Sequence, residues 1–163
     1  MRSLTLACAA LATCALAAGY ALQALWAGVG MVVVVGLLWL AGDRQGWDWT
    51  AELCLAGWVG LAAFGAWWGT ISGWMLIALI AALAAWDLRH FDIRLRNSGA
   101  LPPADLTRAH LRHLALVAAA GLLFGGIALG IRIELTFGWS LLAGALAVIG
   151  VSRLLRAGGR EEG

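Results

Sequence analysis

The sequence predicts an all-α integral membrane protein: a bundle of about six transmembrane helices, with a cytoplasmic helical hairpin that extends the fourth and fifth spans. Of 163 residues, 63% are hydrophobic and only 12% are charged, whereas about a quarter of the residues in soluble domains are charged. The apolar residues also form runs long enough to cross a bilayer, whose core of about 30 Å takes roughly 20 helical residues. The whole chain is therefore expected to form one transmembrane helical domain.

The first two spans follow from length. Between Ser3 and Gly42 the only strongly polar side chain is Gln23. As one helix this stretch would run about 60 Å, twice the hydrocarbon thickness, so it must fold back. The turn is expected between Gly19 and Gln23, which predicts spans over residues 3–20 and 23–41.

A signal peptide is the alternative interpretation of the first span. Arg2, the apolar run after it and the small residues Ala15-Leu16-Ala17 are typical of a secretory leader with its cleavage site.

Polar breaks separate the remaining spans. The segment from Gly69 to Gly73 is rich in turn-forming residues, and a charged stretch follows Trp86. These breaks predict spans over residues 50–68, 73–87, 114–131 and 135–152.

The charged stretch, residues 87–113, is predicted to form the helical hairpin. An apolar stripe at i, i+3 and i+7 continues the fourth helix beyond the membrane, and a stop signal at 97–99 ends it. Two prolines then precede a new helix that starts near Asp105. The stripe consists of Leu88, Phe91 and Leu95.

The arginines predict the orientation. With a cytoplasmic N-terminus, ten of the eleven basic residues lie on the cytoplasmic side and only Arg132 lies outside, as the positive-inside rule requires. An even number of spans then places both termini in the cytoplasm. Every basic residue is Arg, and Ala, Gly and Leu are abundant, which is typical of a GC-rich bacterial genome. The bacterial inner membrane is therefore the predicted location.

Tryptophans are expected at the two membrane interfaces, because the indole ring is apolar and its N–H needs a partner. Trp58 alone lies inside a span. The inner belt would contain Trp39, Trp47, Trp49 and Trp86, and the outer belt Trp26, Trp67, Trp68, Trp74 and Trp139.

Glycine spacing predicts close helix packing, since helices in lipid associate through small residues. Gly121 and Gly125, and Gly126 and Gly130, are four residues apart in the fifth span. These faces could pack within the chain, or against a protein partner or a second copy of the chain.

Ionisable groups inside a membrane are functional candidates, and here they lie near the ends of the predicted spans. Glu52 begins the third span, and Arg132 and Glu134 lie between the last two. These three residues are the candidates for transport or proton relay, with anchoring and local ion pairing as the alternative.

The predicted hairpin holds all three histidines. His110 and His113 share one face of its second arm, and Asp92 could approach them from the first. This set could bind a divalent metal, although a hydrogen bond or ion pair within the hairpin also accounts for it. No predicted span holds a histidine for a haem, and no cofactor is predicted.

The basic residues of the hairpin could bind the headgroups of anionic lipids, or they could serve only to orient the chain. The candidates are Arg89, Arg94, Arg96, Arg108 and Arg112. A net charge of +2 is too small to indicate a nucleic acid partner.

Three functions fit these features. The favoured one is interaction, as a subunit or scaffold of a membrane complex, because the sequence has packing glycines and tryptophans but no motif that identifies a reaction. The second is a small transporter or channel for an ion or small solute. The third is a membrane-embedded enzyme that acts on lipid, and a non-enzymatic role is preferred to it.

Overall fold

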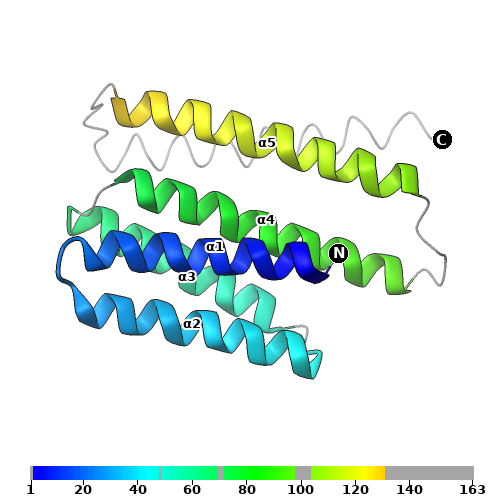
Figure 1. Ribbon diagram of the computed structural model, residues 1–163, viewed down its shortest axis with the longest axis horizontal. Coiled ribbons are helices and arrows are strands. Elements are labelled where there is room, and N and C mark those ends of the chain that lie inside the picture. The colour runs from blue at the N-terminus through cyan, green and yellow to red at the C-terminus, as the bar shows by residue number, and fades with distance from the viewer. Residues whose placement is uncertain (1, 48, 70–71, 98–103, 131–163) are drawn as a thin grey trace. The chain divides into compact units, whose positions relative to one another are not determined.

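The computed structural model describes residues 2–47, 49–69, 72–97 and 104–130, and the described residues form an all-helical bundle (Figure 1). The predicted helical class is confirmed. The five helices are α1 (Arg2–Ala21), α2 (Trp26–Gln45), α3 (Thr50–Trp67), α4 (Ser72–Asn97) and α5 (Ala104–Gly130). All five are long and apolar enough to cross a membrane. The predicted sixth span, 135–152, lies outside the described residues.

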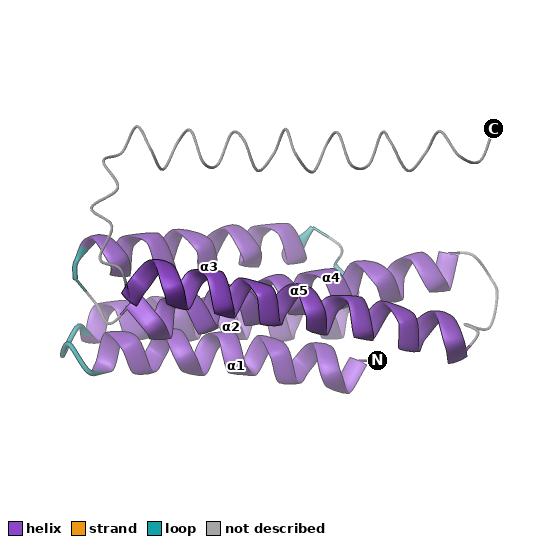
Figure 2. Ribbon diagram, turned by 90° about the horizontal axis from the view of Figure 1, so that it is seen from above, coloured by secondary structure: helices purple, strands orange, loops and turns teal. Residues whose placement is uncertain are grey.

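Consecutive helices run antiparallel (Figure 2). Between α1 and α2 the chain reverses over residues 22–25, a few residues later than predicted, and the N–H of Leu25 donates to the carbonyl of Tyr20 at 3.0 Å. The helix α2 ends at Gly46, whose φ of 72° is left-handed. Glycine adopts this conformation without steric cost, so it is the usual residue at such a helix end.

The two helices that flank residues 98–103 are longer than a bilayer core requires. The helix α4 has 26 residues and α5 has 27. At 1.5 Å per residue each helix is about 40 Å long, roughly 10 Å more than the hydrocarbon thickness.

Small side chains allow the helices to approach closely. The helix α4 packs against α1, α3 and α5, and α1 also packs against α2 and α3. At Gly19 of α1, an added Cβ would come within 2.7 Å of Met75 Cε and 3.3 Å of Trp74 Cβ, both on α4. Contacts of this kind hold helices together in lipid, where hydrophobicity supplies no net attraction. Alanines make up much of the buried surface of these two helices: Ala9, Ala12 and Ala15 on α1, and Ala78, Ala81, Ala82 and Ala85 on α4.

Aromatic side chains fill the rest of the core. Trp39 of α2 and Trp58 of α3 are each 1% exposed, and their ring centroids lie 5.2 Å apart. The prediction that Trp39 belongs to an interfacial belt missed this burial, because the face that a residue occupies depends on the rotation of its helix against its neighbours.

Tyr20 connects α1 to α3. Its ring is fully buried, and its hydroxyl donates to the carbonyl of Leu61 at 2.6 Å. Replacing Tyr20 by phenylalanine should lower the free energy of unfolding by about 1 kcal/mol, since it removes one buried hydrogen bond and little volume. Reversible unfolding in mixed detergent micelles measures this loss, and an unchanged stability would show that the hydrogen bond contributes nothing.

Candidate functional site

Polar side chains gather at the end of the bundle where α1 begins, α2 ends and α3 begins. Arg2 Nε lies 2.9 Å from Asp43 Oδ2, which joins the start of α1 to the end of α2. Arg89 of α4 reaches the turn between α2 and α3, where its Nη2 donates to the carbonyl of Trp47 at 2.7 Å. These contacts bring three arginine-bearing segments, around Arg2, Arg44 and Arg89, to the lining of one cavity of about 280 Å³.

Arg89 is the one buried charged side chain among the residues whose burial the structure describes, with 6% of its surface exposed. Its guanidinium carbon lies 5.4 Å from the ring centroid of Trp39, within the range of a cation–π contact. Its Nη1 is buried and has no hydrogen-bond partner in the described part of the chain. The expected place of Arg89 was an exposed basic rim, whereas it lies inside the bundle end.

Glu52, the first relay candidate, pairs with a histidine of α4. Its Oε1 lies 3.2 Å from Nε2 of His90, and the Glu52 side chain is 57% exposed. The other ring nitrogen of His90, Nδ1, lies 3.1 Å from the carbonyl of Trp86. Both ring nitrogens of His90 therefore face acceptor oxygens. The Glu52–His90 pair joins α3 to α4 near the end of the bundle, where more than half of the Glu52 side chain is exposed.

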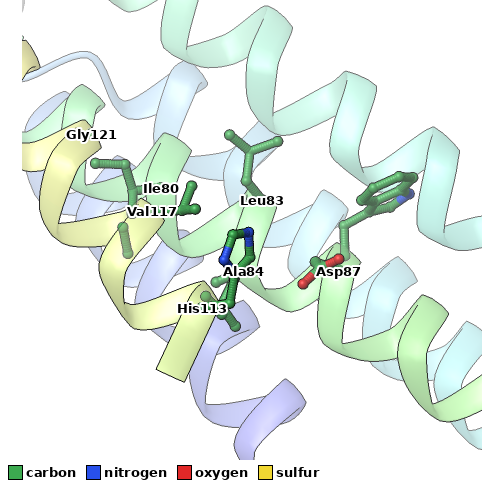
Figure 3. Close-up of a pocket in the computed structure, with 10 residues that line it drawn as sticks. Ile80, Leu83, Ala84, Asp87, His113, Val117 and Gly121 are labelled. Carbon is green, nitrogen blue, oxygen red and sulfur yellow. The ribbon is translucent and has the colours of Figure 1, made fainter. Parts of the chain in front are cut away.

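A second cavity, of about 380 Å³, lies between α4 and α5. Figure 3 shows Asp87 and His113 toward one end of it and Gly121 toward the other. Apart from Asp87 and His113 its lining is almost wholly apolar. Further along the helix, an added Cβ at Gly125 would come within 2.6 Å of Leu76 Cδ1, so the glycine face 121/125 packs within the chain. Gly126 has open space.

The candidate metal residues lie in different places. His110 Nε2 lies 3.0 Å from Asp87 Oδ2, outside the angles of a hydrogen bond, and its ring stacks on Phe91 with centroids 4.0 Å apart. His113 lines the cavity between α4 and α5, whereas Asp92 lines the cavity that contains Arg89. The described residues contain no group of three His, Cys, Asp or Glu side chains placed to hold a metal ion.

The partner of His110 follows from helix geometry. Asp87 and Phe91 are four residues apart, so they share the face of α4 that meets α5. Asp92 lies about 140° around the helix from Asp87, toward the interior of the bundle end.

The remaining candidates are on the surface or outside the described residues. Arg94, Arg108 and Arg112 are exposed. The side chain of Arg96, and both Arg132 and Glu134, lie outside the described part.

The sequence did not predict that Arg2, Asp43 and Arg44 line the same cavity as Arg89. One signal pointed to the burial of Arg89: it stands four residues after Ala85, the last of the buried alanines of α4.

The fold defines a class, a bundle of helices that are long and apolar enough to span a membrane. No protein family, curated protein or solved structure matches this chain.

Proposed function

We propose that this chain is a small polytopic membrane protein that acts by interaction, as a subunit or scaffold of a membrane complex. The observation that carries the proposal is the filling of the bundle centre. In the described helices the buried apolar side chains are those of alanine, leucine, valine, methionine, cysteine and aromatic residues. The buried polar or charged side chains, Thr5, Thr50 and Arg89, lie toward the helix ends. A conduction path needs polar groups or a hydrated cavity at mid-membrane, so this core favours a structural role over transport.

The surface of α5 supports the same proposal. Among the described helices α5 packs only against α4. It exposes large apolar side chains, with Phe124 69% exposed and Leu123 61% exposed. Helix surfaces of this kind, with the open position at Gly126, suit contact with another transmembrane helix or with lipid.

The proposed topology has six spans, with both termini in the cytoplasm of a bacterial inner membrane. Arg2, Arg44 and Arg89 line one cavity at one bundle end, which fits the positive-inside rule. The extra length of α4 and α5 would then project from the cytoplasmic face as a helical hairpin. Reporter fusions at both termini test this topology, and an external C-terminus would overturn it.

The functional test is isolation of the full chain from native membranes in a gentle detergent, after brief chemical crosslinking. The proposal predicts that a partner chain co-purifies in a fixed ratio with the wild-type protein. A variant with α5 surface changes, Leu123→Ala and Phe124→Ala, should lose it, whereas the matched change Val33→Ala and Val34→Ala on α2 should keep it. A lone species that moves a solute across liposomes would refute the proposal.

A further inference from the structure

The burial of Arg89 is unusual because no carboxylate of the described residues lies within ion-pair distance of it. Its only hydrogen bond there is the one from Nη2 to the carbonyl of Trp47, at 2.7 Å. A guanidinium has five N–H donors, and Nη1 has no partner among the described residues. The Trp39 ring, 5.4 Å from the guanidinium carbon, offsets part of the cost of burial. A buried charge without a counter-charge remains costly, so such groups are normally paired or bound to a ligand.

Arg89 lines the cavity of about 280 Å³ together with two other arginines, Arg2 and Arg44, and two aspartates, Asp43 and Asp92. Three positive and two negative side chains leave an excess of one positive charge. Arg2 Nε lies 2.9 Å from Asp43 Oδ2, so the charges of these two side chains offset each other. The positive excess therefore lies with Arg89 and the exposed Arg44.

We propose that this cavity binds a phosphate group through Arg89 and Arg44. The planar guanidinium offers parallel N–H donors that match phosphate oxygens, which is why arginine predominates in phosphate sites. A divalent cation is disfavoured, because it would meet more arginines than carboxylates.

The position of the cavity indicates the source of the phosphate. The cavity lies at the end of helices that match a membrane in length, where the phosphodiester headgroups of phospholipids are found. Inorganic phosphate shares the chemistry and is the alternative source.

The experiment compares ligand binding by the full chain and three variants. Native mass spectrometry of the protein in detergent measures retention of phosphatidylglycerol and, for comparison, phosphatidylcholine. Arg44→Gln and Arg89→Gln should each weaken phosphatidylglycerol binding about tenfold, because each removes a charge-assisted hydrogen bond. Arg108→Gln is the matched control, since Arg108 is an exposed arginine of α5 that does not line this cavity.

Adding inorganic phosphate distinguishes a phospholipid ligand from free phosphate. If the ligand is a lipid, added phosphate should leave bound phosphatidylglycerol in place. If it is free phosphate, added phosphate should raise the unfolding temperature of the wild type and of Arg108→Gln, but not of the two cavity variants. Because Arg44 is exposed, Arg44→Gln tests the site even if Arg89→Gln fails to fold. Equal loss of lipid in all three variants would assign binding to the general basic surface and overturn the proposal. Unchanged lipid binding in Arg44→Gln and Arg89→Gln would overturn it as well.

Discussion

Replacing Trp58 by alanine should lower the free energy of unfolding by about 3 kcal/mol, near the low end of the usual loss for a core aromatic residue. The indole is 1% exposed and lies against Trp39, with ring centroids 5.2 Å apart. The loss should fall at the low end because the unfolded helices remain in lipid, so the change removes packing and little hydrophobic transfer.

Trp67→Ala is the matched control for this prediction. Trp67 ends the same helix and is 88% exposed, so its loss should cost much less than that of Trp58. Unfolding by sodium dodecyl sulfate in mixed micelles measures both variants. Equal destabilisation of the two would show that Trp58 does not lie in a packed core.

Replacing Gly42 by alanine should cost a similar amount, about 3 kcal/mol, by overfilling the contact between α2 and α3. An added Cβ would come within 2.7 Å of Thr50 Cβ and also overlap its hydroxyl. Thr50 is fully buried, and its Oγ1 donates to the carbonyl of Trp47 at 2.6 Å, so the threonine cannot move aside. The helices would have to separate.

Gly30→Ala is the control on the same helix, because an added Cβ there meets nothing within 4 Å. Alanine favours a helix over glycine by about 0.5–1 kcal/mol, so this variant should be slightly more stable than the wild type. The two substitutions are therefore expected to change stability in opposite directions. A loss of stability in both would assign the effect of Gly42→Ala to something other than Thr50.

The sequence predicted the all-helical class and apolar helices of membrane length, because lipid thickness limits the length of a span and Gly or polar breaks end it. The extension of the fourth helix was also predicted, from the stripe at Leu88, Phe91 and Leu95, and α4 ends at Asn97. The turn after the first helix was placed a few residues too early, since Gly19 packs against α4 and does not break the helix.

The site was predicted less well. Arg89 was assigned to the same basic rim as Arg94 and Arg108, yet only Arg89 is buried. The side chains of each helical turn point in all directions around the helix axis. The neighbouring helices determine which of these directions faces the interior of the bundle. The cavity around Arg89 combines segments more than 40 residues apart, and no local pattern reveals such a combination. The same reason applies to His110, which meets Asp87 and not Asp92.

The most direct test of a dry bundle centre is the reactivity of cysteines placed in it. In a background with the native Cys8, Cys14 and Cys54 replaced, single cysteines are introduced at Ala12 and Ala82, which are 0% exposed and lie in the middle of α1 and α4. A thiol reacts as the thiolate, which forms in water. Both positions should therefore react with a small water-soluble thiol reagent at least about a hundredfold more slowly than a cysteine at the exposed Ser3. Labelling at Ala12 and Ala82 as fast as at Ser3 would reveal a hydrated path through the bundle and contradict the proposed role in interaction.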